Sequence, residues 1–369
     1  MTDAGPAAEP RAGEPNSSSA PRYIMPAEWE PHDATWIAWP HHEPDWPGKL
    51  GAIPWVYAEI VRALYTHERV EILCHDRIVR DAAAAMLAAH DVSSDGYRLH
   101  IVPTDRVWLR DSAPTFVWKD GGSLELASWR FNAWAKYENY RLDEKVGDAI
   151  AEITGLDRVA PMRPDTGEPI VLEGGGVEVN GSGRLLVTEE WLLSDVQVRN
   201  PGMTRDNYEG AFATYLGVTE TIWLGKGAAG DDTHGHIDDV ARFTSPEAAL
   251  LAFEENPGDA NVQPSLENFQ RLEIASREQP LRIVKLPYPR PVIMNGQRLP
   301  ASYANFYVAN GLVLVPTFND PMDRVALDII AGEFPDREIV GIHSVDLVWG
   351  LGTIHCLTQQ QPSPRRTGA

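Results

Sequence analysis

Apolar residues recur at helical spacing in several stretches of the chain, and each stretch is followed by a short apolar run typical of a strand. Residues 54–67 open with Pro54, a residue favoured in the first turn of a helix, and residues 70–76 (VEILCHD) predict the next strand. The same order recurs in four further pairs: 76–90 and 98–104, 205–217 and 221–225, 265–278 and 281–288, and 323–335 and 337–346. A further helix over 141–155 is expected to end at Gly155, a typical C-cap. This alternation predicts an α/β protein.

A β-hairpin is predicted where residues 171–179 and 184–193 flank the turn sequence NGSG. Sequence identity does not recur at a fixed period, which argues against a solenoid. Loops at the ends of the strands are expected to gather around one site. We predict one catalytic domain over residues 22–362, preceded by a disordered tail (1–21) and followed by a short tail (363–369).

Composition narrows the range of functions. The formal net charge is -21, with 53 acidic and 32 basic residues, the reverse of the basic surface that nucleic-acid binders carry. An acidic surface also repels anionic membranes and attracts cations, although the same charge would serve solubility alone. Apolar runs stay short of the ~20 residues of a membrane span, and the N-terminus lacks the pattern of a secretory signal. We expect a cytoplasmic protein that binds neither nucleic acid nor membranes, and a homodimer stays open.

Four loops hold most of the side chains that could perform chemistry. Their candidates are Trp108, Arg110 and Asp111 in VWLRDSAP, Glu173 in VLEGGGVEV, Asp231, Asp232, His234, His236, Asp238 and Asp239 in GDDTHGHIDD, and His355 and Cys356 in GLGTIHC.

Each loop taken singly has a plainer explanation. A lone cysteine is more often a small buried hydrophobe, which fits Cys74 in VEILC, whereas the glycines beside Cys356 indicate close backbone approach. His236 and Asp238 are two residues apart, so on a strand they would share one face. A metal site competes for HGHID, but the thiolate or distant third histidine of a convincing zinc site is missing. EGGG lacks the Lys-Ser/Thr of a phosphate loop.

In chain order, however, W-x-R-D, E-G-G, G-H-x-D and G-T-I-H-C resemble the agmatine deiminase and bacterial peptidylarginine deiminase family of guanidino-modifying enzymes. The resemblance extends over MPAEWEPHDATWIAWP, ASYANFYVANGLVLVP and IHCLTQQQP, and so covers nearly the whole predicted domain. It implies a five-bladed α/β propeller, built from pseudo-symmetric ββαβ modules around a central active site.

The resemblance also implies a role for each candidate and requires neither a cofactor nor a metal. Cys356 would be the nucleophile, His236 the acid–base group and Glu173 the group that orients it. The substrate would be bound by Asp111 and Asp238 at its guanidinium, by Trp108 along the pocket and by Asp232 at its amine end. For Asp231 and Asp232 a solvated loop or a structural cap is an equal alternative.

The implied reaction is hydrolysis of agmatine to N-carbamoylputrescine and ammonia through a covalent cysteine thiouronium, a step of putrescine and polyamine metabolism. Carboxylates match the planar fork of a guanidinium, and its resonance-stabilised carbon requires a strong nucleophile such as thiolate. Peptidylarginine deimination is the main alternative. An amidinotransferase and a non-catalytic guanidino-binding protein are more distant ones.

Four positions depart from the family pattern near the implied site. Ala113 and Leu351 stand where glycine is usual, His234 stands in the usual T-D-G-H, and Trp191 replaces a cysteine expected in a strand. None of these changes removes a catalytic group, so they are expected to affect substrate preference.

Overall fold

The structure is a computed structural model that describes residues 22–120 and 122–365, and the predicted tail 1–21 lies outside the described residues. Its α-helices are α1 (Ile53–Leu64), α2 (Arg77–Ala89), α3 (Leu109–Ser112), α4 (Val146–Thr154), α5 (Glu189–Leu193), α6 (Arg205–Leu216), α7 (Val262–Glu278), α8 (Met322–Glu333) and α9 (Ile354–Leu357). Its strands are β1 (Tyr23–Ile24), β2 (His32–Ala38), β3 (Arg69–Cys74), β4 (Tyr97–Ile101), β5 (Thr115–Lys119), β6 (Ser123–Ala127), β7 (Arg158–Val159), β8 (Glu178–Val179), β9 (Arg184–Thr188), β10 (Glu220–Leu224), β11 (Ala241–Ser245), β12 (Ala248–Phe253), β13 (Arg282–Pro287), β14 (Ile293–Met294), β15 (Gln297–Arg298), β16 (Tyr307–Ala309), β17 (Leu312–Thr317), β18 (Glu338–His343) and β19 (Gln359–Pro362). The predicted α/β class is confirmed.

Five of the sheets share one pattern. Each contains an antiparallel pair of strands, and the second strand of the pair is followed by a helix and then by a parallel strand. The pattern occurs in β5-β6-β7 with α4, β8-β9-β10 with α6, β11-β12-β13 with α7, β16-β17-β18 with α8, and β19-β2-β3 with α1. The last of these sheets joins β19, the last described strand, to β2, the second, so segments from near both ends of the described chain pair with each other.

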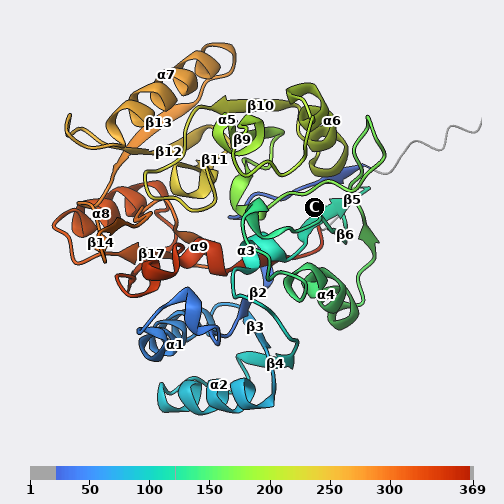
Figure 1. The fold of residues 1–369 in the computed structure, drawn as a ribbon, viewed down its shortest axis with the longest axis vertical. Coiled ribbons are helices and arrows are strands. Elements are labelled where there is room, and N and C mark those ends of the chain that lie inside the picture. Colours follow the sequence, from blue (N-terminus) through green and yellow to red (C-terminus); the bar gives the residue numbers. More distant parts are fainter. Residues whose placement is uncertain (1–21, 121, 366–369) are drawn as a thin grey trace, which may run out of the picture.

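The crossover helices cover the outside of the molecule, and the short helices lie near its middle. Figure 1 shows α1, α2, α4, α6, α7 and α8 around the periphery, with α3 and α9 close to the centre of the view. Helix α1 illustrates the cause: Ile53, Tyr57, Ile60, Val61 and Leu64 recur at helical spacing and are buried against the sheet. The described helices include none with the length and apolar composition needed to cross a membrane.

Two local features of the structure were predicted from the sequence: the turn of the β8–β9 hairpin and the end of helix α4. Strands β8 and β9 pair across NGSG, with Glu178 opposite Leu186. The first predicted strand, 171–179, is wrong over most of its length, because Gly174–Gly176 form a 3₁₀ turn and only Glu178–Val179 pair. Gly155 ends α4 in the left-handed region at φ 69°. The prediction that residues 184–193 form one strand is wrong, because β9 stops at Thr188 and Trp191 lies in α5. The Thr188 side chain accepts a hydrogen bond from the Trp191 amide and acidic residues fill the first turn, as at a typical helix start.

Candidate active site

Three of the predicted site residues meet over a single glycine. Gly175 lies in the 3₁₀ turn Gly174–Gly176, directly after Glu173. A Cβ built at Gly175 would lie 2.6 Å from His236 Nδ1, 2.9 Å from an Asp111 carboxylate oxygen and 3.1 Å from an Asp238 carboxylate oxygen. A side chain at position 175 would have no room, so glycine is required there. The loop EGGG lies where Asp111 meets His236 and Asp238, which come more than a hundred residues later in the chain.

Asp111 is a buried carboxylate in α3 whose two oxygens are both fixed. Trp134 Nε1 donates to Oδ2 at 2.8 Å, and the Gly175 amide donates to Oδ1 at 3.0 Å. Burial raises the pKa of Asp111 to about 6; the positive charge of His236 opposes this rise and the charge of Asp238 adds to it. Asp111 is therefore ionised at neutral pH but takes up a proton in mild acid.

His236 is a buried imidazole set between two carboxylates. It precedes the 3₁₀ turn Ile237–Asp239, so the prediction of a strand that carries His236 and Asp238 on one face is wrong. Nδ1 lies 3.8 Å from Asp111 Oδ1 and Nε2 lies 3.6 Å from Glu173 Oε2. Burial lowers the pKa of His236, but the charges of Asp111 and Glu173 outweigh it and raise this pKa to about 9. His236 therefore holds a proton at neutral pH.

Glu173 is the fixed negative charge behind His236. Arg199 Nε donates to Oε1 at 3.0 Å, and Trp191 Nε1 donates to Oε2 at 2.7 Å. Burial would raise the pKa of Glu173, but Arg199 and His236 outweigh it and lower this pKa to about 2. The Trp191 ring also meets the His236 ring edge to face, with centroids 5.5 Å apart. Trp191 thus contacts both groups.

Cys356 lies in α9 with its thiol facing Asp238 and Asn305. Sγ is 3.7 Å from Asp238 Oδ2, and Asn305 Nδ2 donates to Sγ at 3.1 Å. Asn305 Oδ1 also accepts from Thr353 Oγ1 at 2.7 Å and from the His355 amide at 3.0 Å, so one amide group holds the loop around Cys356. Burial and the charge of Asp238 raise the pKa of the Cys356 thiol well above its usual value, so without a bound cation it stays protonated.

A pocket of about 290 Å³ opens next to these groups. Its lining includes Cys356 and Asp111 together with the aromatic residues Trp108, Trp134 and Tyr137. Trp108 packs against Trp46 with ring centroids 5.5 Å apart, and a Cβ at Gly352 would lie 2.7 Å from the Trp108 ring and 3.1 Å from Cys356 Cβ. The tryptophan wall and the thiol therefore face the same space.

Two neighbouring aspartates lie in different settings beside the pocket. Asp231 accepts hydrogen bonds from the amides of Thr233 and Gly235, both at 2.7 Å, so it is the structural cap of its own loop. Asp232 lines the pocket, where it accepts from Tyr137 Oη at 2.7 Å and pairs with Lys136 Nζ. Of the two, Asp232 is the one that a bound molecule can reach.

Of the four departures from the family pattern, only Leu351 lines the pocket. Leu351 has φ 70° and His234 has φ 65°, both in the left-handed region that favours glycine. His234 Nε2 lies 3.0 Å from Ser194 Oγ, and Leu351 lines the pocket. Ala113 has ordinary extended angles, and Trp191 takes the hydrogen-bonding position on Glu173 described above.

Sequence reasoning missed several residues that hold the site in place. These are Glu28, Trp134, Arg199 and Asn305, which contact His355, Asp111, Glu173 and Cys356, respectively. The one available signal was a polar residue inside an otherwise apolar stretch, as for Asn305 in ASYANFY. Within the part of the chain that the structure describes, groups of three or more His, Cys, Asp or Glu side chains arranged to hold a metal ion are absent.

Comparison with known proteins gives a consistent result. Residues 24–362 match the model of the Porphyromonas-type peptidyl-arginine deiminase family. A putative agmatine deiminase of Latilactobacillus sakei is 35% identical, with 93% of this chain and 97% of the relative covered. An agmatine deiminase of Stutzerimonas stutzeri is 34% identical, with coverages of 94% and 98%. The solved agmatine deiminase of Enterococcus faecalis superposes with a TM-score of 0.83 at 29% identity, with coverages of 92% and 96%.

Proposed function

Because the chain belongs to the Porphyromonas-type peptidyl-arginine deiminase family, we propose that it hydrolyses agmatine to N-carbamoylputrescine and ammonia. It is a hydrolase of carbon–nitrogen bonds in linear amidines, as its agmatine deiminase relatives are. The observation that carries the proposal is the meeting of Asp111, His236 and Asp238 over Gly175, with the Cys356 thiol beside Asp238.

The site carries buried negative charge that a guanidinium would neutralise. Asp111 and Asp238 are both buried. The charge of Asp238 raises the pKa of Asp111, and both carboxylates raise the pKa of the Cys356 thiol. A guanidinium is planar, permanently charged and rich in N–H donors, so it can pair with both carboxylates at once. Its charge would also lower the pKa of the Cys356 thiol, so substrate binding helps to form the thiolate.

The reaction then proceeds in two halves. The Cys356 thiolate attacks the guanidinium carbon, His236 donates its proton to one terminal nitrogen, and the carbon–nitrogen bond breaks to release ammonia. A covalent thiouronium remains on sulfur. His236, now neutral, takes a proton from water as the water oxygen attacks the same carbon. The carbon–sulfur bond then breaks to give the free thiolate, and the remaining hydroxyl proton passes to solvent to leave the neutral ureido product. Glu173 holds His236 in place and stabilises its charged form.

The amine at the far end of the substrate must compete for Asp232 with side chains already bound to it. Lys136 pairs with it, but the Lys136 side chain is 40% exposed and can swing into solvent. An exposed ion pair contributes only about 0–1 kcal/mol, so the amine of agmatine can displace the lysine at small cost. Asp45 also lines the pocket but is paired with Arg106, so Asp232 is the better anion for a substrate amine.

The decisive experiment measures ammonia and ureido product with agmatine, free arginine and an arginine-terminated peptide. We expect agmatine to be strongly preferred, because arginine would bring a carboxylate toward Asp232. Asp232→Asn should lower kcat/KM for agmatine and narrow the gap to arginine, whereas Lys136→Met should lower KM for agmatine by up to about fivefold. A wild-type preference for either arginine substrate would refute the agmatine proposal.

We further propose that the five sheets of shared pattern are the blades of a five-bladed propeller around this site. The support is the repetition of one ββαβ module in five sheets. A catalytic free thiol functions best in a reducing compartment, and both cysteines are free, so we propose that the enzyme acts in the cytoplasm on a small cationic substrate. A homodimer stays a prediction.

A further inference from the structure

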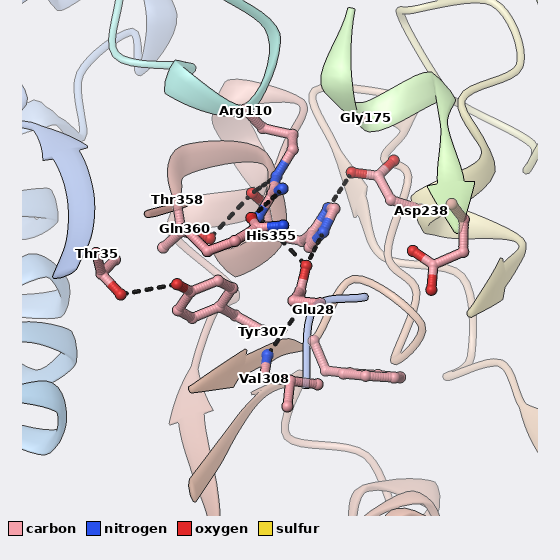
Figure 2. A network of polar contacts seen from close by, with 12 residues as sticks. Glu28, Thr35, Arg110, Gly175, Asp238, Tyr307, Val308, His355, Thr358 and Gln360 are labelled. Atoms are coloured by element: carbon pink, nitrogen blue, oxygen red, sulfur yellow. Dashed lines mark hydrogen bonds and ion pairs between the residues drawn. The ribbon is translucent and has the colours of Figure 1, made fainter. Parts of the chain in front are cut away.

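His355, the neighbour of the nucleophile, lies buried between two carboxylates. Its Nδ1 is 2.7 Å from Asp238 Oδ2 and its Nε2 is 2.8 Å from Glu28 Oε2. Figure 2 shows the ring bridging these two side chains. A neutral imidazole donates from one nitrogen only, and carboxylates accept only. The doubly protonated ring is therefore the form that satisfies both contacts.

Glu28 is a rigid, charged anchor for this ring. Arg242 Nη2 donates to Oε1 at 2.9 Å, the Val308 amide donates to the same oxygen at 2.8 Å, and Arg110 Nη2 lies 3.4 Å from Oε2. Burial raises the pKa of Glu28, but the charges of Arg242 and His355 outweigh it and hold this pKa well below its usual value. Glu28 therefore stays ionised and holds His355 from the side away from the substrate.

Asp238 is left with one fixed oxygen and one free oxygen. Oδ2 accepts from His355, whereas Oδ1 is buried and has no hydrogen-bond partner among the described residues. Burial would raise the pKa of Asp238, but the hydrogen bond and charge of His355 lower it. The ionisable groups around Asp238 and His355 are Glu28, Arg110, Asp111, Glu178, His236, Asp239, Arg242 and Cys356.

We propose that His355 is a positioning residue: anchored by Glu28, its imidazolium keeps Asp238 ionised and holds Oδ2 of Asp238, which leaves Oδ1 free to pair with the bound guanidinium. This inference rests on the proposed function, because Asp238 is taken to bind the substrate. It explains how a carboxylate buried beside other carboxylates stays charged without a bound cation. Both ring nitrogens of His355 are engaged, one by Asp238 and one by Glu28, so His355 acts on the substrate through Asp238.

The test compares two alkylating agents at Cys356, the cationic 2-chloroacetamidine and the neutral iodoacetamide. Only the amidinium needs Asp111 and Asp238 to be ionised, so the ratio of the two rates reports the state of these carboxylates without any turnover. In wild type we expect the amidine to be favoured down to about pH 6, where Asp111 takes up a proton. In His355→Asn, which keeps an amide donor but loses the charge, the pKa of Asp238 should rise above that of Asp111 and move the acid limb of this ratio to higher pH. At high pH the preference should recover, because Asp238 then ionises without help.

His32→Asn is the matched control, since His32 is also buried and paired with a glutamate, Glu68, but lies away from the pocket. It should leave the profile unchanged. If His355→Asn does not fold, His355→Gln gives the same comparison. An unshifted acid limb in a folded His355 variant overturns the inference alone. A wild type that shows no preference for the amidine overturns the proposed function together with it.

Discussion

Replacing Gly175 by alanine tests whether the geometry of the site depends on this one close approach. The added Cβ would lie 2.6 Å from His236 Nδ1, whereas ordinary contacts of a Cβ begin near 3.4 Å. The imidazole must therefore retreat by about 0.8 Å, and the Asp111 oxygen at 2.9 Å must also move. Gly175 does not have a positive φ, so alanine adds crowding without backbone strain.

A misplacement of about 1 Å can cost about 100-fold in rate, so kcat/KM for agmatine should fall by about that factor. Crowding of this kind costs about 1–3 kcal/mol of stability, which leaves most of the protein folded. The assay is steady-state ammonia release together with a thermal unfolding curve. Gly210→Ala is the control: Gly210 is inside α6 with nothing within 4 Å of its Cβ, so alanine should stabilise by about 0.5–1 kcal/mol and leave activity unchanged. Near-normal kinetics in a folded Gly175→Ala variant would refute the reasoning.

Three further predictions concern the proposed chemistry. Cys356→Ser should lose nearly all turnover, while Cys74→Ser should keep most of it. Labelling with a haloacetamidine followed by peptide mapping should place the label on Cys356. A label on Cys74 instead would refute the assignment of Cys356 as the nucleophile. Asp111→Asn and Asp238→Asn each leave the guanidinium half-paired, which costs roughly 2–5 kcal/mol, so kcat/KM should fall at least about thirtyfold in each; near-normal values in either would exclude that residue as a ligand. Dialysis against a chelator should leave activity intact, and a loss that zinc restores would favour metal-assisted hydrolysis instead.

The parts of the fold that depend on local patterns were predictable from the sequence. Helices such as α1 and the hairpin β8–β9 follow from apolar periodicity and from turn residues a few positions away. The failure at Trp191 is instructive, because the apolar run WLL suggested a strand while the capping signal of Thr188 and the following glutamates decided for a helix. At this position the capping hydrogen bond of Thr188, and not the pattern of apolar residues, determines the secondary structure.

The supporting contacts of the site were not predictable, because they join segments that are distant in sequence. Asn305 contacts a thiol 51 residues away, and Glu28 contacts a histidine 327 residues away. Whether a charged residue is buried and paired depends on what the fold brings against it. The chemical groups could be named from their motifs, but the arrangement that sets their pKa values could not.

The pH dependence of kcat/KM follows from two of these pKa values. Asp111, with a pKa of about 6, must be ionised to bind the guanidinium, so activity should rise as the pH increases through about 6. His236, with a pKa of about 9, must be protonated to release ammonia, so activity should fall as the pH increases through about 9. The substrate guanidinium stays charged throughout this range, and Glu173, with a pKa of about 2, does not titrate in it. Glu173→Gln removes a charge that raises the pKa of His236, so it should move the alkaline limb to lower pH and leave the acid limb in place. An alkaline limb that does not move in this variant would show that a group other than His236 supplies the proton.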